Sequence, residues 1–155
     1  MNVKTARQIA EEWVRRHAGQ SPSFRGAYFS GSIVDWPDDA EMPIGSDIDI
    51  MIVIDQEEAP PKLGKFIYNG ILLEVTYISL SQLASAEEVL SSYHLAGGFR
   101  TNTIIADPSG MLGELHANVS RHFTELAWVR RRCENAREKI VNGLRNIDRS
   151  APFHD

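Results

Sequence analysis

Residues 46–54 read Ser46-Asp47-Ile48-Asp49-Ile50-Met51-Ile52-Val53-Ile54, and this stretch decides the fold of the 155-residue chain. Its continuous apolar, largely β-branched character is typical of a buried strand. Side chains alternate across a strand, so Asp47 and Asp49 project from the same face. At about 4 Å and an effective dielectric constant of about 20, two such anions repel each other by about 4 kcal/mol. A cation should offset that repulsion, and a divalent metal held by carboxylate oxygens is the natural candidate.

The composition indicates one soluble globular domain. Hydrophobic residues make up 43% of the chain and charged residues 24%, enough for a real core with an ordinary surface. The net charge of −5 makes the chain a poor binder of polyanions, so no nucleic-acid polymer is expected as its main partner. No signal peptide and no membrane-spanning stretch is evident, and a cytoplasmic location is expected. The single cysteine, Cys133, excludes an intrachain disulfide and is interpreted as a packing residue.

The periodicity of apolar residues predicts an α/β (α+β) domain with a small mixed β-sheet flanked by helices. The dipeptide Asn69-Gly70 is a strong hairpin signal between strands at 65–68 and 71–78. A helix that begins after Ser79 or Ser81 should run to about Tyr93. Further strands are expected at 27–30, 47–54 and 102–106, and further helices at 3–18, 108–123 (with Asp107 as N-cap and Pro108 in the first turn) and 125–147.

The last predicted helix carries an apolar stripe and a basic run. The basic run, Arg130 to Arg132, is most simply its solvated face. The stripe is spaced three and four residues apart, which is typical of a helix that buries one face. It consists of Leu126, Val129, Cys133, Ala136, Ile140, Leu144 and Ile147.

Glu74 interrupts the otherwise apolar strand predicted at 71–78. An unpaired buried carboxylate would cost several kcal/mol or become protonated. If this strand lies beside the strand of Asp47 and Asp49, Glu74 joins them on one face, and three carboxylates could hold one or two Mg²⁺ ions. The alternative is a solvent-facing or edge position for Glu74.

These elements together resemble the nucleotidyltransferase superfamily of the polymerase β type. The resemblance rests on Gly31-Ser32, then Ser46-Asp47-Ile48-Asp49-Ile50, then Glu74 on a later strand. Within the superfamily, residues 98–101 and 104–110 resemble a segment common in the small-molecule branch, which includes aminoglycoside nucleotidyltransferases. The resemblance covers about residues 25–150. The fourteen-residue spacer, 33–46, is longer than is usual in the family, which lengthens a loop without removing a motif residue.

The resemblance implies a nucleotidyltransferase fold and transfer of a nucleoside monophosphate from an NTP to a hydroxyl of a small acceptor, with release of pyrophosphate. Gly31, Ser32, Ser46 and Arg100 would then bind the nucleotide, and Lys65 is a further candidate to neutralise phosphate charge. Asp47, Asp49 and Glu74 would be the catalytic, metal-binding carboxylates. Whether Glu74 is a metal ligand or the general base stays open.

The acidic loop between the phosphate turn and the acid pair has two interpretations. Asp35, Asp38, Asp39 and Glu41 form either an ordinary solvated loop or a recognition surface for a cationic acceptor such as an aminoglycoside antibiotic. The second interpretation would make the chain an antibiotic-resistance enzyme.

The resemblance also implies a domain division. Residues 1–123 would be the catalytic domain, and 124–155 a long helix with the start of a C-terminal helical region near 150–155. That region suggests either a missing helical domain or a homodimer; whether the natural chain continues past Asp155 stays open. Two alternatives to the enzyme are an antitoxin of a nucleotidyltransferase-type toxin–antitoxin pair and a catalytically silent nucleotide-binding domain.

Overall fold

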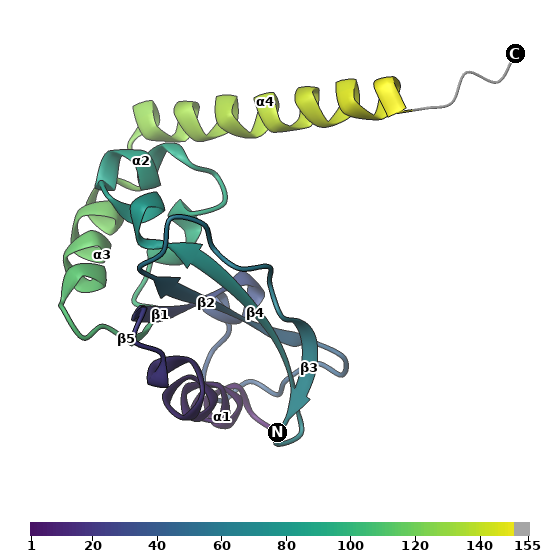
Figure 1. Cartoon of the computed structure of the whole chain (residues 1–155), viewed down its shortest axis with the longest axis vertical. Helices are drawn as coiled ribbons and strands as arrows, with labels where there is room; N and C mark the ends of the chain where they lie inside the picture. The colour runs from purple at the N-terminus through teal and green to yellow at the C-terminus, as the bar shows by residue number, and fades with distance from the viewer. Residues whose placement is uncertain (151–155) are drawn as a thin grey trace, which may run out of the picture.

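The computed structural model describes residues 1–150, and its centre is a five-stranded mixed sheet with helices on both faces (Figure 1). The strand order is β3-β4-β2-β1-β5, in which β2 and β4 are parallel and the other neighbours antiparallel. The predicted fold class is therefore confirmed. The strands are β1 (Phe24–Ser30), β2 (Asp47–Ile54), β3 (Gly64–Tyr68), β4 (Ile71–Ser79) and β5 (Ile104–Ala106).

Helix α1 (Val3–Arg16) covers one face of the sheet. The Asn2 side chain caps it by accepting a hydrogen bond from the Thr5 backbone N–H at 2.9 Å. The apolar side of α1 packs on alternate residues of β2 and β4, which form one continuous core with it. The sheet residues in that core include Ile48, Ile50, Ile52, Leu73 and Val75.

The opposite face of the sheet is covered only in part. Helices α2 (Ala86–Ser91) and α3 (Met111–His122), with a 3₁₀ turn at Ala96–Phe99, pack over Tyr28, Val53 and Ile78. Val53 and Ile78 lie near the C-terminal ends of β2 and β4. The first halves of these strands have no helix packed on them on this side. The open half is the half that carries the acidic side chains.

The helix predicted from Ser79 to about Tyr93 is wrong as a single element. The chain forms a 3₁₀ helix at Leu80–Leu83 and then begins α2 anew, because the Ser85 hydroxyl accepts from the Glu88 backbone N–H at 3.1 Å. Asp107 is likewise not the N-cap of α3, which starts after Gly110. Its carboxylate still accepts from the backbone N–H groups of Leu112 and Gly113, at 3.1 and 2.8 Å.

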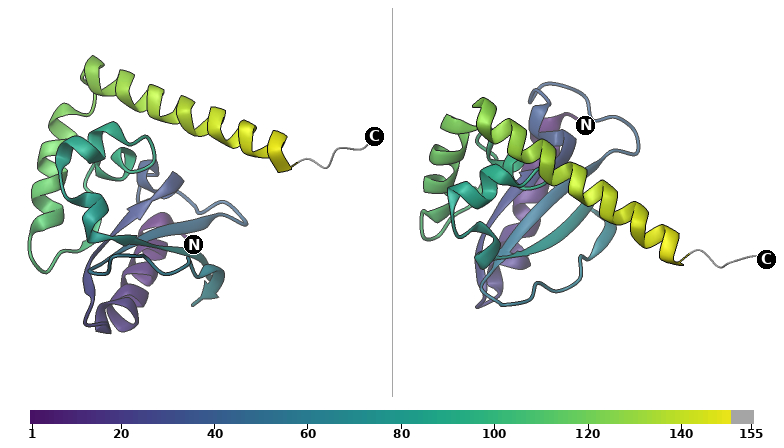
Figure 2. Two further views of the ribbon diagram at one scale, coloured as in Figure 1. Left: turned by 45° about the horizontal axis from the view of Figure 1, so that its top comes forward. Right: turned by 90° about the horizontal axis from the view of Figure 1, so that it is seen from above.

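Helix α4 (Leu126–Ser150) projects from the body and contacts mainly α2 (Figures 1 and 2). No residue of α4 within 126–150 is buried, so the predicted packing role of Cys133 is wrong: its thiol is exposed because nothing described covers that face. The basic run is also not uniformly solvated, since Arg132 donates to the carbonyls of Leu90 and Phe123.

The helix start expected near 150–155 lies outside the described residues. Among the helices of residues 1–150, none has the length and apolar character that crossing a membrane requires.

Candidate active site

The three predicted acids meet on the open face of the sheet. In the parallel ladder Asp49 pairs with Glu74 and Asp47 pairs with Leu72, so the three acidic side chains lie on one face. One carboxylate oxygen from each of Asp47, Asp49 and Glu74 lies within 4.8 Å of the others. β4 is an internal strand, so the alternative of an edge position for Glu74 is wrong; its side chain is 14% exposed on the open face.

Two lysines from the neighbouring edge of the sheet contact the acids. Lys65 lies opposite Glu74 on β3, and its Nζ is 2.6 Å from Oδ2 of Asp47 and 3.8 Å from Oε2 of Glu74. Lys62, just before β3, forms an ion pair with Glu74. Lys62 was not among the predicted residues, because its partner is twelve positions away and only the hairpin pairing brings it close. Asp49 forms no ion pair within residues 1–150.

The three acids of the cluster therefore lie in different electrostatic environments. Burial, followed by the charges of Asp47 and Glu74, raises the pKa of Asp49. The hydrogen bond from Lys65 lowers the pKa of Asp47, and the same hydrogen bond raises the pKa of Lys65. Asp49 is thus the acid that lacks a cation, while Asp47 and Glu74 have lysine partners. An all-oxygen donor set with one uncompensated charge fits a hard divalent cation such as Mg²⁺.

Asp49 should lower the stability of the metal-free protein at neutral pH. Its folded-state pKa is raised, so its favourable contribution is complete below its ordinary value of 3.8 and is lost as the pH rises through the folded value. Replacing Asp49 with Asn should therefore raise Tm at pH 7 in EDTA. Solvent screening of the partly buried carboxylate keeps the expected rise to about 2–4 °C.

Calorimetry of both proteins between pH 4 and 8 measures this effect. The stability difference should shrink as the pH falls toward the ordinary aspartate value. A less stable Asp49→Asn protein at pH 7 would contradict the assignment of Asp49 as the uncompensated acid.

The glycine-serine turn lies directly beside Asp49. Ser30 pairs with Asp49 across β1 and β2, and Gly31 follows with a left-handed φ of +68°. A Cβ atom at Gly31 would be 2.0 Å from Oδ2 of Asp49, so only glycine fits here without displacing the carboxylate. Ser32 is exposed in the 3₁₀ turn Gly31–Asp35.

Arg7 holds this turn in place from helix α1. Its guanidinium donates to the carbonyls of Ile33 and Trp36 and forms a 2.6 Å ion pair with Asp38. The sequence offers no local signal for this role, since Arg7 lies on the polar side of α1 and its partners are 26 to 31 positions away.

Most charges of the acidic loop are neutralised within the chain. Asp38 pairs with Arg7, Glu41 pairs with the N-terminal amine at 3.0 Å, and Asp35 pairs with Arg100. Arg100, a predicted phosphate ligand, is therefore bound to that loop. Asp39 is exposed and forms no ion pair within the described chain. The loop presents less free negative charge than its sequence suggests.

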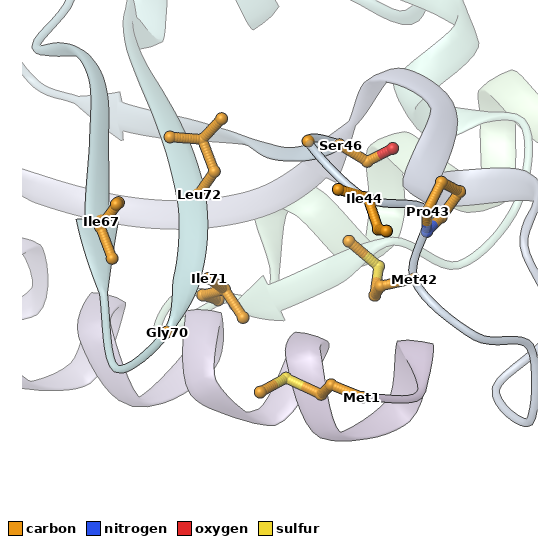
Figure 3. Close-up of a pocket in the computed structure, with 10 residues that line it drawn as sticks. Met1, Met42, Pro43, Ile44, Ser46, Ile67, Gly70, Ile71 and Leu72 are labelled. Atoms are coloured by element: carbon orange, nitrogen blue, oxygen red, sulfur yellow. The ribbon is translucent and has the colours of Figure 1, made fainter.

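Ser46 lines a cavity of about 380 Å³ that the sequence did not predict (Figure 3). The loop of Met42, Pro43 and Ile44 borders one side of this cavity, and the β3–β4 hairpin borders the other. Its lining is mostly apolar: Met1, Met42, Pro43, Ile44, Gly45, Ser46, Ile67, Gly70, Ile71 and Leu72.

The mixed sheet with helices on both faces is the nucleotidyltransferase fold, as predicted. One solved structure that it resembles is a nucleotidyltransferase-like protein from Exiguobacterium sibiricum, with a TM-score of 0.53 and 15% sequence identity over 75% of this chain. The chain spans 40% of the length of that protein, and at this identity the similarity is one of fold. No protein-family model and no curated protein sequence matches the chain. The aminoglycoside branch stays a prediction.

Proposed function

We propose that the chain is a Mg²⁺-dependent nucleotidyltransferase that moves a nucleoside monophosphate from an NTP to a hydroxyl of a small acceptor and releases pyrophosphate. The observation that supports this function best is the acid cluster of Asp47, Asp49 and Glu74, whose oxygens converge within 4.8 Å on the open face. The adjoining Gly31 is a second, independent observation in favour of this function, because the absence of a Cβ atom there leaves room beside the Asp49 carboxylate.

The carboxylates of Asp47, Asp49 and Glu74 would hold the metal. When bound, Mg²⁺ supplies positive charge that neutralises the triphosphate and the charge that develops during transfer. The two lysines, Lys62 and Lys65, now offset part of the acid charge and would stay beside the phosphates as additional cations.

The chain's own groups position the reactants. Gly31, without a side chain, lets phosphate approach the backbone, and the exposed Ser32 hydroxyl can donate to a phosphate oxygen. Glu74 either completes the metal ligand set or accepts the proton of the acceptor hydroxyl. The acceptor oxygen bonds to the α-phosphorus as the bond to the pyrophosphate oxygen breaks. Positioning and charge neutralisation therefore account for most of the proposed catalysis.

Mg²⁺ and an NTP together should stabilise the protein. A ligand at about 100 times its Kd adds about 2.7 kcal/mol to the free energy of unfolding, which corresponds to a rise of about 5–10 °C in Tm. Thermal unfolding with each of the four NTPs, with and without Mg²⁺, measures this effect and reveals the preferred base. AMP with Mg²⁺ is the control. An equal rise with EDTA in place of Mg²⁺ would contradict metal-assisted nucleotide binding.

A transfer assay tests the reaction itself. The protein is incubated with Mg²⁺, α-phosphate-labelled NTPs and candidate acceptors, namely aminoglycosides, lincosamides, neutral alcohols and copurified proteins. Label on a small acceptor with matching pyrophosphate release supports the proposal. Label only on a copurified protein would favour the antitoxin alternative, and nucleotide binding with no transfer to any acceptor would favour the catalytically silent one.

A further inference from the structure

The apolar cavity lies at the start of β4, and part of its wall, formed by Ile67 and Leu72, is on the face of the acid cluster. By register, Ile67, Leu72 and Asp47 form one row across β3, β4 and β2. The next row on that face holds Lys65, Glu74 and Asp49. Ile67 and Leu72 line the cavity, so this part of its wall is one row of residues away from Glu74 and Asp49.

The rim of the cavity exposes large aliphatic side chains. Ile44 is fully exposed, and Ile67 is 76% exposed. In Figure 3, Ile44 and Met42 on the loop stand across the gap from Ile71 and Leu72, and Met1 lies below. Exposed aliphatic residues grouped around a hollow are typical of a binding site, and about 380 Å³ is within the range of small-molecule pockets.

The cavity also lies on the side from which an acceptor should approach. The acids occupy β2 and β4 in the middle of the sheet, with Gly31 on the β1 side and the cavity on the β3–β4 side. Phosphoryl chemistry of this kind places the attacking and leaving oxygens roughly in line, on opposite sides of the phosphorus. If the triphosphate binds at Gly31, the attacking hydroxyl therefore has to approach from the side of the cavity.

We propose that this cavity binds the apolar body of the acceptor, so that the acceptor is a neutral alcohol with an aliphatic body and its hydroxyl lies at the Asp47 and Glu74 end. This inference rests on the proposed function and specifies its substrate class. The acceptor hydroxyl oxygen forms the new bond to the α-phosphorus, its proton passes to Glu74 or to water, and pyrophosphate leaves. The internal pairing of Asp35, Asp38 and Glu41 argues against a polycationic acceptor.

Binding of hexyl β-D-glucoside, without nucleotide or metal, tests the cavity separately from the reaction. We expect methyl NMR shifts at Met42, Ile44 and Ile71 with this probe, and none with methyl β-D-glucoside or kanamycin. Ile44→Asp should weaken binding about tenfold or more, because a charge at the rim opposes an apolar ligand. Ile140→Asp, at another exposed isoleucine (64%) on α4, is the matched control and should bind as the parent does.

The outcomes separate the acceptor site from the activity. Absence of these shifts, or equal binding to the Ile44→Asp protein, would overturn the proposed acceptor site while leaving nucleotide binding by Mg²⁺ and NTP intact. A dimer that Ile44→Asp dissociates would also overturn it, because a second copy would then cover the cavity. Specific binding of the hexyl probe with no transfer from any NTP would support the site and count against the proposed reaction.

Discussion

Asp49→Asn is expected to reduce Mg²⁺-dependent transfer from an NTP by about 10³-fold or more, while the protein stays folded. Asp49 is the one acid of the cluster with no cationic partner within residues 1–150, and it is the acid that Gly31 contacts most closely. Asparagine preserves the shape of the side chain but removes the negative charge that would hold a metal ion. Losing one such electrostatic interaction in an active site costs about 10²–10³ in rate, and a lost metal ligand costs more.

Rates of pyrophosphate release for the parent and the variant, each at saturating NTP, measure the effect. The matched control is Asp55→Asn, which makes the same change at an exposed aspartate just beyond β2 whose one ion pair within residues 1–150 is with Arg25. This control should keep the parental rate, since an exposed ion pair contributes little. Because Asp49→Asn should also raise Tm in EDTA, loss of activity with raised stability would exclude unfolding as the cause. Unchanged turnover would refute the metal assignment.

The parts of the fold that local chemistry dictates were predictable. Asn69-Gly70 forms the expected turn, with Asn69 at φ +46° and Gly70 at φ +82°, as a tight hairpin of this type requires. The alternation of Asp47, Ile48 and Asp49 places the acids on one face because strand geometry allows nothing else. These features need only neighbours in sequence or in one hairpin.

The features that the sequence did not predict depend on tertiary contacts. The stripe on α4 has helical spacing whether or not a partner covers it. Periodicity therefore predicted the helix correctly, whereas the predicted packing of a stripe residue, Cys133, was wrong. Lys62 and Arg7 reach their partners only after the sheet and α1 have assembled. The cavity forms where a loop, a hairpin and the N-terminus meet, and none of the three carries a motif for it.

Gly31→Ala is expected to lower transfer by about 10²-fold and the free energy of unfolding by about 1–2 kcal/mol. The stability loss comes from the left-handed backbone at φ +68°, which a residue with a Cβ atom adopts at a cost of this size. The activity loss has another cause. The new methyl group would lie 2.0 Å from Oδ2 and 2.9 Å from Cγ of Asp49, so the carboxylate must move. A displacement of about 1 Å at a reacting centre is enough for a loss of about 10² in rate.

Gly110→Ala distinguishes the two causes. Gly110 has a similar left-handed φ of +80°, but within residues 1–150 no atom beyond its chain neighbours lies within 4 Å of a Cβ atom placed there. Both variants should therefore lose similar stability in urea unfolding, whereas only Gly31→Ala should lose transfer. If both kept the parental rate, the contact between Gly31 and Asp49 would have no catalytic consequence. If both lost it equally, loss of stability rather than displacement of the carboxylate would be responsible, and the turn would lose its assigned role beside the acid cluster.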